Sequence, residues 1–407
     1  MRRLRKAGRP ANLWVVEASV PKGVTCPLLY DLRVELAGRS LRQPSAVHVV
    51  PRFADDLTCI QITDTELSDR DPAPARRLAR AIREINLIAP DFVLASGDLT
   101  YDGQAKQFDT LIELLGQLDV PVFTQIGNAD YHGDESIYFG RINAYRDYVV
   151  DLGGLRVIGL DSGTNYKQSK GAYNLALDNE GTGLSDDQIT WFQAALTRAP
   201  PRSLRLAFMH FPAVSQFGNR GSIHFNRERF KALCERHRVA LVLCGHTHVD
   251  SVFDQREKIY LSGRPPKARP CYVQSATTSS RTRMPMLPYS YRLVRIKDRR
   301  AVSFTYDANG DGQPDAMRSV PVGKLDVRFD SPNDGASPDV TATITNELNE
   351  TLDRARLVFR VPSKSGATYR VDGGTLACTV PDGKHHRVLV AARVPARSTR
   401  VVRLKQR

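Results

Sequence analysis

The sequence predicts an α/β protein with β-rich segments at both ends. Short apolar runs alternate with amphipathic stretches from residue 57 to about residue 250. Helical patterns stop after about residue 305, and Pro and Gly separate short alternating runs before residue 57. We therefore expect an N-terminal β-rich unit over 1–56, an α/β domain over 57–305, an Asp/Gly-rich linker over 306–322 and a C-terminal β-sandwich over 323–407.

The elements of the α/β domain follow from hydrophobic periodicity. Strands are predicted for "LTCIQIT", "PDFVLAS", "VPVFTQI", "LRVIGLDS", "LRLAFMHFP" and "VALVLCGHTH", and helices for "ARRLARAIREINLI", "QFDTLIELLGQL", "SDDQITWFQAAL" and "FNRERFKALCERH". Ser185 and Gln188 have the spacing of a capping box at the start of the third of these helices. After residue 323, runs such as "PDVTATITN" and "ARLVFRVP" are typical of sandwich strands.

Composition restricts the class of protein. The 407 residues are 41% apolar and 25% charged, which is typical of a soluble globular chain. No apolar run reaches the roughly 18–20 residues that a membrane-spanning helix needs. The basic N-terminus lacks the apolar region of a secretory signal, so the default expectation is a cytoplasmic protein, although a β-sandwich of this kind also suits an extracytoplasmic enzyme. The six cysteines contain no Cys-x-x-Cys pair and do not decide the compartment.

The net charge of +14 is concentrated at the two ends of the chain. Residues 1–57 carry 10 Lys and Arg against 5 Asp and Glu, and residues 323–407 carry 15 against 9, whereas the middle holds 33 against 30. An enzyme that acts on nucleic acid concentrates positive charge around its active site. The balanced charge of the middle therefore argues against a nuclease. The sequence does not decide the oligomeric state.

Polar residues follow five predicted strands of the α/β domain. The groups are Asp64-Thr65-Glu66, Gly97-Asp98, Gly127-Asn128-Ala129-Asp130, His210, and Gly245-His246-Thr247-His248. We expect them at one edge of one sheet. If the backbone of "HTH" is extended, its two histidines lie on the same side. Carboxylate and amide oxygens combined with imidazole nitrogens suit a pair of Mn, Fe, Zn or Mg ions, which together activate a bridging hydroxide and neutralise phosphoryl charge.

In this order and spacing the five groups resemble the signature of the calcineurin-like metallophosphoesterases, which include purple acid phosphatases and class III cyclic-nucleotide phosphodiesterases. The resemblance covers about residues 57–300. It implies a four-layered αββα sandwich and metal-dependent hydrolysis of a phosphodiester or phosphomonoester. Carried over by position, it implies that Asp98 bridges two metals, and it assigns the other ligands as follows: Asp64, Glu66 and His248 to the first metal, and Asn128, His210 and His246 to the second.

Two positions depart from the family pattern. The first motif normally ends in His and here ends in Glu66, which replaces a neutral nitrogen with a charged, harder oxygen and favours Mn or Mg. The His that normally follows Asn128, and is thought to protonate or stabilise the leaving group, is Ala129. His132, three residues later, either reaches back into the site beside the catalytic Asp98 and Asn128 or is only a solvated loop residue. The alternative is a catalytically impaired phosphoesterase that acts as a metal-stabilised binding or scaffold protein.

Two further patterns each allow a structural and a functional interpretation. Arg220, between His210 and "GHTH", is either a solvated cation or a ligand for the substrate phosphate. Asp307, Asn309, Asp311 and Asp315 have the spacing of the first half of an EF-hand loop, but Arg318 occupies the twelfth position, where a full EF-hand has Glu. The segment is therefore a short calcium loop or a plain Gly/Asp turn.

Overall fold

The described residues divide into two units, Met1–Pro51 and Arg52–Arg407. A computed structural model describes residues 2–3, 14–15, 28–50, 52–163, 182–260, 269–282, 288–298, 301–304, 306–313, 315 and 318–407. In the first unit, β1 (Arg2–Arg3) pairs with β2 (Trp14–Val15), and β3 (Leu29–Leu36) forms an antiparallel hairpin with β4 (Arg39–His48). The predicted N-terminal β structure is therefore present.

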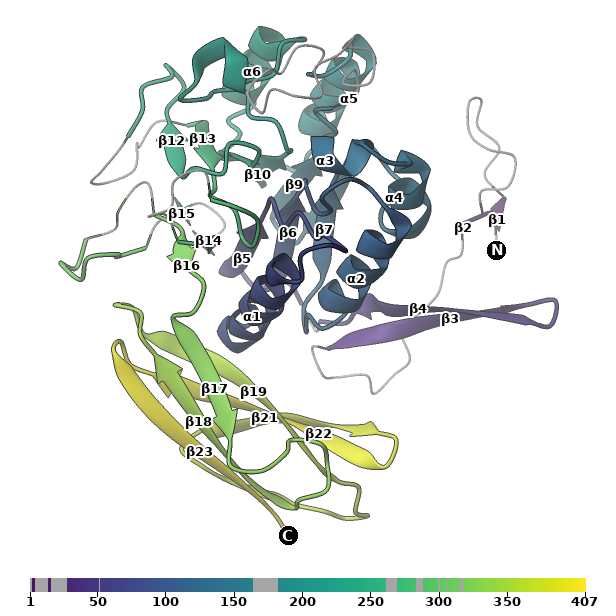
Figure 1. Cartoon of the computed structure of the whole chain (residues 1–407), viewed down its shortest axis with the longest axis vertical. Helices are drawn as coiled ribbons and strands as arrows, with labels where there is room; N and C mark the ends of the chain where they lie inside the picture. The colour runs from purple at the N-terminus through teal and green to yellow at the C-terminus, as the bar shows by residue number, and fades with distance from the viewer. Residues whose placement is uncertain are drawn as a thin grey trace. The chain divides into compact units, whose positions relative to one another are not determined.

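The second unit contains two large sheets (Figure 1). One has the order β12-β13-β11-β10-β9-β8, formed by β8 (Tyr148–Leu152), β9 (Leu155–Gly159), β10 (Leu204–Phe208), β11 (Leu241–Cys244), β12 (Ser251–Phe253) and β13 (Cys271–Gln274). The other has the order β15-β14-β5-β6-β7, formed by β5 (Leu57–Ile62), β6 (Phe92–Ser96), β7 (Val122–Gln125), β14 (Ser290–Lys297) and β15 (Ala301–Ser303), with β16 (Val320–Pro321) also paired to β14. Strands β5, β6 and β7 are parallel, as are β9, β10 and β11, so each set ends at one edge of its sheet.

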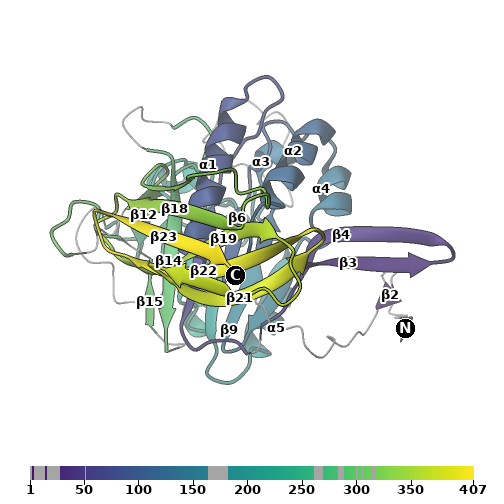
Figure 2. The same cartoon turned by 90° about the horizontal axis from the view of Figure 1, so that it is seen from below.

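Alternation along the strands creates the layers. Cys59 of β5 and Leu94 of β6 pack in a buried cluster with residues of the other sheet, whereas Ile60 and Val93 belong to a second cluster that contains the helices. The helices are α1 (Ala73–Ile88), α2 (Ala105–Leu115), α3 (Asn128–Tyr131), α4 (Glu135–Arg141), α5 (Asp186–Thr197), α6 (Arg227–Arg236) and the 3-10 helix η3 (Gly218–Gly221). Figure 2 shows α1, α2 and α4 on one side of the sheets and α5 on the other. The four-layered arrangement predicted from the sequence is confirmed.

The predicted start of α5 is also confirmed in detail. The Gln188 amide N–H donates to Ser185 Oγ over 3.2 Å, and the Ser185 N–H donates to Gln188 Oε1 over 2.9 Å, which completes the capping box. Among the helices of the described residues, none has the length and apolar character needed to cross a membrane.

The C-terminal residues form the predicted β-sandwich. Its sheets have the orders β17-β18-β23-β20 and β19-β22-β21, built from β17 (Leu325–Phe329), β18 (Asp339–Asn346), β19 (Leu352–Pro362), β20 (Tyr369–Asp372), β21 (Thr375–Asp382), β22 (His385–Val394) and β23 (Ser398–Gln406). Every second residue of β18 is buried, and Phe329 meets Phe359 edge to face between the sheets. Cys378 on β21 is disulfide-bonded, whereas Cys59 and Cys244 are free, buried thiols.

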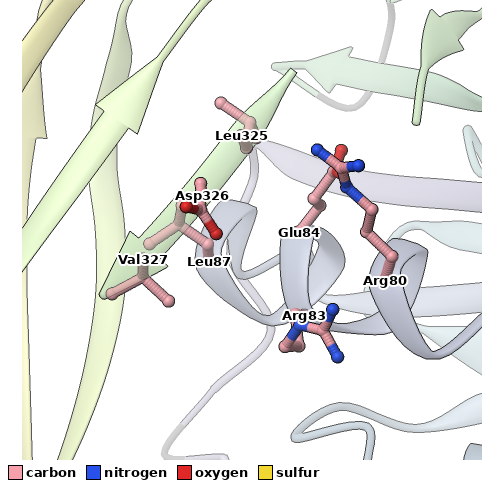
Figure 3. Close-up of a pocket in the computed structure, with 7 residues that line it drawn as sticks. All are labelled: Arg80, Arg83, Glu84, Leu87, Leu325, Asp326 and Val327. Carbon is pink, nitrogen blue, oxygen red and sulfur yellow. The ribbon is translucent and has the colours of Figure 1, made fainter. Parts of the chain in front are cut away.

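A buried carboxylate joins α1 to the start of the sandwich. Glu84 accepts hydrogen bonds from the Gly323 N–H (2.5 Å) and the Tyr291 hydroxyl (3.1 Å), and Arg80 lies 3.6 Å from the same carboxylate. A cavity of about 20 Å³ beside it is lined by residues of α1 and β17 (Figure 3). Burial raises the pKa of Glu84 to about 7, against the opposing effect of these hydrogen bonds and of Arg80.

Replacing Glu84 with Gln should flatten the pH dependence of stability. Because the folded state holds this proton more tightly than the unfolded chain, the group costs stability as the pH rises from about 4.5 to about 7, at about 1.4 kcal/mol per pH unit. Denaturant unfolding at several pH values should show this slope as the difference between wild type and Glu84→Gln. The control is Glu113→Gln on α2, and a Glu84→Gln profile parallel to wild type would contradict the account.

Candidate metal centre

The five predicted polar strand ends meet in one place, but they come from two sheets. Asp64, Asp98 and Asn128 follow β5, β6 and β7 of one sheet, whereas His210 and the "HTH" segment follow β10 and β11 of the other. The expectation of a single sheet edge was therefore wrong. The two sheets face each other across a shared buried cluster, so the carboxyl ends of their parallel strands open toward a common space.

The first group of side chains surrounds Asn128. Its Oδ1 lies 3.1 Å from His210 Nε2 and 3.0 Å from His246 Nδ1. His210 Nε2 is also 3.2 Å from Asp98 Oδ2, while Asp98 Oδ1 accepts a hydrogen bond from the Ala129 N–H over 2.8 Å. Asp98, His210 and His246 are all buried, and each offers one ligand atom within 4.8 Å of the others. The structure thus brings together Asp98 and the three residues predicted for the second metal.

The second group contains Asp64, Glu66 and His248. His248 Nε2 lies 3.2 Å from Asp64 Oδ1 and 3.1 Å from Glu66 Oε1. Both carboxylate oxygens of Asp64 also accept from the His246 N–H, over 3.0 and 3.1 Å. Glu66 points into the group rather than away from it, so the structure brings all three residues predicted for the first metal together.

The backbone of these ligands is unusual. Five of the seven predicted ligands have a positive φ, a region that residues other than Gly rarely adopt. They are Asp64 (51°), Glu66 (40°), Asp98 (49°), His246 (68°) and His248 (56°). The "HTH" segment is therefore not extended, so the condition for both histidines to lie on the same side is not met. Because both histidines have left-handed backbones, the His246 side chain lies beside Asn128 and the His248 side chain lies beside Glu66. Each histidine therefore belongs to a different one of the two groups of side chains. Strain of this kind persists where the surrounding structure and function require it.

Two motif glycines permit the close approach of the strand-end loops. Gly97 has a φ of +86°, and a Cβ atom there would lie 2.7 Å from the ring of His210. At Gly127, a Cβ atom would overlap the backbone nitrogen and Oδ1 of Asp98. A larger residue at either position would push a ligand out of the cluster.

The hydrogen bonds of the imidazoles fit a bound cation. His210 Nδ1 lies 2.9 Å from the Ser96 carbonyl, and His248 Nδ1 lies 2.8 Å from the Arg281 carbonyl. A carbonyl oxygen can only accept, so Nδ1 carries the proton in both rings. In the neutral imidazole, the Nε2 lone pair of His210 then faces oxygens of Asp98 and Asn128. The Nε2 lone pair of His248 likewise faces oxygens of Asp64 and Glu66. Lone pairs that converge in this way, with the opposite ring nitrogen fixed by a carbonyl, are the arrangement that metal-binding histidines use.

The pKa values of these side chains also favour a bound cation. Burial disfavours the charged form of His210, but the adjacent Asp98 outweighs burial and raises the pKa of His210 to about 9. Burial likewise raises the pKa of Asp98, but His210 and His246 lower it to about 2. For His248, the carboxylates of Asp64 and Glu66 overcome burial and raise the pKa well above its usual value. Both groups therefore attract positive charge, which a proton or a metal cation supplies.

At position 129 the backbone contacts the site, whereas the side chain adds no polar group. Ala129 is buried, and its side chain offers neither a proton nor a ligand atom, but its N–H orients Asp98. His132 is exposed at the end of α3, and its compensating role stays a prediction. Arg220 lies in η3, and its side chain is outside the described residues, so its contact with substrate also stays a prediction.

Asp130 has a structural role that the sequence analysis did not assign. Its carboxylate accepts from the Gly127 N–H (2.9 Å), the Leu99 N–H (3.2 Å), and both the N–H and the hydroxyl of Thr100 (2.8 and 2.7 Å). It thereby ties the loop after β7 to the loop after β6. Burial and the nearby Asp98 raise the pKa of Asp130 to about 6. An Asp residue beside a predicted turn has no sequence feature that would identify such a role.

The carboxylates of the linker accept hydrogen bonds from the backbone of their own loop. Asp307 accepts from the N–H groups of Gly310 (2.7 Å) and Gly312 (3.0 Å), and Asp315 accepts from the Ala308 N–H (3.0 Å). Among the described residues, the group of His, Cys, Asp and Glu that converges as a metal site is Asp98, His210 and His246, and it contains none of these loop residues. Calcium binding here stays a prediction from spacing.

Comparison with known proteins agrees with the geometry. Residues 57–250 match the family model described as calcineurin-like phosphoesterase. The chain is 26% identical over 206 residues to a probable glycerophosphodiester phosphodiesterase of Arcobacter nitrofigilis, which covers 46% of this chain and 71% of the relative. It is 27% identical over 254 residues to a 3',5'-cyclic adenosine monophosphate phosphodiesterase of Pseudomonas aeruginosa, which covers 59% of this chain and 85% of the relative.

A solved dimetal phosphatase from Danio rerio shares the fold. It superposes with a TM-score of 0.50 at 13% identity and covers 65% of this chain and 98% of that structure. The matched residues 57–250 include all seven predicted ligands, from Asp64 to His248. Residues 57–250 therefore belong to the calcineurin-like phosphoesterase family.

Proposed function

We propose that this chain is a dinuclear-metal-dependent phosphoesterase whose substrate is a phosphodiester. The observation that carries the proposal is the pair of donor groups around His210 and His248, each with an imidazole nitrogen aimed at oxygens of neighbouring loops. Two divalent cations bound there would activate the attacking water and neutralise charge on the phosphoryl group. The relatives named as phosphodiesterases support the same reaction class.

The charge of the donor groups favours a diester over a monoester. Asp64, Glu66 and Asp98 supply three carboxylates, so with two divalent cations the centre would carry one positive charge before the attacking water loses its proton and no net charge once it is a hydroxide. With His in place of Glu66, the centre would carry one more positive charge in each of these states. A phosphodiester has one negative charge and a phosphomonoester has up to two near neutral pH. Since buried charge must be balanced, the lower positive charge that Glu66 gives the centre favours the less negatively charged substrate, the diester.

The remaining residues of the site hold the donors in place. The Ala129 N–H fixes one oxygen of Asp98, which leaves the other directed at His210. The carbonyls of Ser96 and Arg281 fix the tautomers of His210 and His248. Because the Ala129 side chain holds no proton, the leaving group must depart without a proton donor at that position. We therefore propose a preference for esters with acidic leaving groups.

A second candidate is a binding or scaffold protein that keeps the metals for structure. The methyl group of Ala129 in place of an imidazole favours it, since this is the one position of the family pattern from which all side-chain chemistry is missing. The donor groups themselves are intact, which is why we place the enzyme first. Activity measurements on metal-loaded protein separate the two candidates.

Metal-depleted protein should gain activity from added metal. We expect Mn²⁺ to restore hydrolysis of bis(p-nitrophenyl) phosphate and to restore hydrolysis of p-nitrophenyl phosphate to a lesser extent. Release of p-nitrophenol after chelation and single additions of Mn²⁺, Zn²⁺, Mg²⁺ or Fe²⁺ measures both activities. Absence of turnover with every metal, in protein shown to bind them, would support the scaffold candidate.

Replacing Glu66 with His should shift selectivity toward the monoester. The change adds one unit of positive charge to the metal-loaded centre, so we expect kcat/KM for the monoester to rise relative to that for the diester by about tenfold, on the order of 1.4 kcal/mol. Steady-state kinetics on the two p-nitrophenyl esters measure the ratio. An unchanged ratio in a variant with normal metal content would show that net charge does not set ester preference.

Replacing Ala129 with His should help poor leaving groups most. A positioned proton donor is typically worth about 10²–10⁴-fold, and its benefit grows as the leaving group becomes more basic. We expect a large gain for an alkyl phosphodiester and little change for the p-nitrophenyl diester. The dependence of kcat/KM on leaving-group pKa is the measurement, with Ala129→Asn as a polar control. Equal gains for all leaving groups would argue against this role.

A further inference from the structure

A run of buried hydroxyl residues lies against the first metal position. Residues 275–281 read "SATTSSR" and follow β13. Within this run, the fully or almost fully buried Ser and Thr residues are Ser275, Thr277, Thr278, Ser279 and Ser280. Buried hydroxyls need hydrogen-bond partners. We call residues 277–281 the hydroxyl strap, because its bonds run along the loop that carries Asp64 and Glu66.

The strap pairs with each residue of that loop in turn. The Thr278 N–H donates to the Thr63 carbonyl (2.9 Å), and the Thr277 hydroxyl donates to the Asp64 carbonyl (2.7 Å). The Ser279 hydroxyl donates to the Thr65 carbonyl over 2.9 Å. These bonds hold the backbone of a loop whose residues 64 and 66 have positive φ. They explain how the loop keeps a conformation that costs energy locally.

At its end the strap contacts the two ligand side chains themselves. The Ser280 hydroxyl donates to Glu66 Oε2, and the Arg281 carbonyl accepts from His248 Nδ1 over 2.8 Å. Glu66 Oε1 is then left 3.1 Å from His248 Nε2, on the side where the lone pair of the imidazole points. Two consecutive strap residues therefore set the orientation of two ligands for the same metal.

We propose that Ser280 is a positioning residue that makes Glu66 a one-oxygen ligand of the first metal. This inference rests on the proposed function, since it concerns the same centre. A carboxylate with one oxygen engaged by a hydroxyl donor presents the other oxygen alone, in the manner of the imidazole that the family pattern has at this position. Ser280 thus adapts the site to Glu66, so that a harder ligand occupies the place of a histidine without binding through both oxygens.

The test is metal binding, measured apart from turnover. Titration of metal-free protein with Mn²⁺, followed by calorimetry and by the electron paramagnetic resonance of free Mn²⁺, should give two sites in wild type. We expect Ser280→Ala to weaken one of them about 10–100-fold and to leave the other within about twofold. Ser279→Ala is the matched control, because it removes a hydroxyl of the same buried strap that bonds a carbonyl instead of a ligand.

A double-mutant cycle shows whether Ser280 acts through Glu66. In a Glu66→Gln background, Ser280→Ala should cause no further loss of Mn²⁺ affinity, and thermal unfolding of the metal-free variants should confirm that all are folded. Wild-type affinity in Ser280→Ala, an equal loss in Ser279→Ala, or an undiminished loss in the Glu66→Gln background would each overturn the positioning role. Failure of the wild type itself to bind Mn²⁺ or to turn over any ester would instead overturn the proposed function.

Discussion

The balance of buried negative charge is the constraint on which this centre depends. Asp64, Asp98 and Asp130 are almost completely buried at neighbouring strand ends. Buried carboxylates are stable only when donors or cations surround them. Asp130 meets the requirement with four donors of the adjoining loops, whereas Asp64 and Asp98 face histidines. The difference separates a structural carboxylate from two that are available to a cation.

The same constraint explains why the centre needs both sheets. One sheet supplies all three carboxylate ligands and the other supplies the three histidines, so the negative charge of the first edge is balanced only by groups held between the two sheets. Hydrogen bonds between the loops lock the two edges together. The His246 N–H donates to both carboxylate oxygens of Asp64 (3.0 and 3.1 Å), and the side-chain amide of Gln61 donates to the Cys244 carbonyl (3.0 Å). Fold stability and ligand geometry therefore share one network of contacts, and a substitution in the loops affects both.

Much of the fold, and which residues meet at the strand ends, could be predicted from the sequence, because both rest on local signals. Strand and helix periodicity, the Ser185 cap and the order of the polar strand ends are each contained within a few residues. The facing of two sheets is not a local property, so the single-edge expectation was wrong. The left-handed turns at His246 and His248 depend on contacts with Asp64 and Asn128, which the dipeptides around them do not encode. The roles of Asp130 and Ser280 arise from partners 30 and 214 residues away in sequence.

The most direct test of this account is the crystal structure of the Mn²⁺-loaded protein with anomalous diffraction at the manganese edge. The account predicts two anomalous peaks about 3.5–4 Å apart, one against Glu66 and His248 and the other against Asn128 and His210, with Asp98 between them. A single peak, or two peaks with the Glu66 carboxylate turned away from both, would contradict the claim that the strand ends of both sheets build one dinuclear centre.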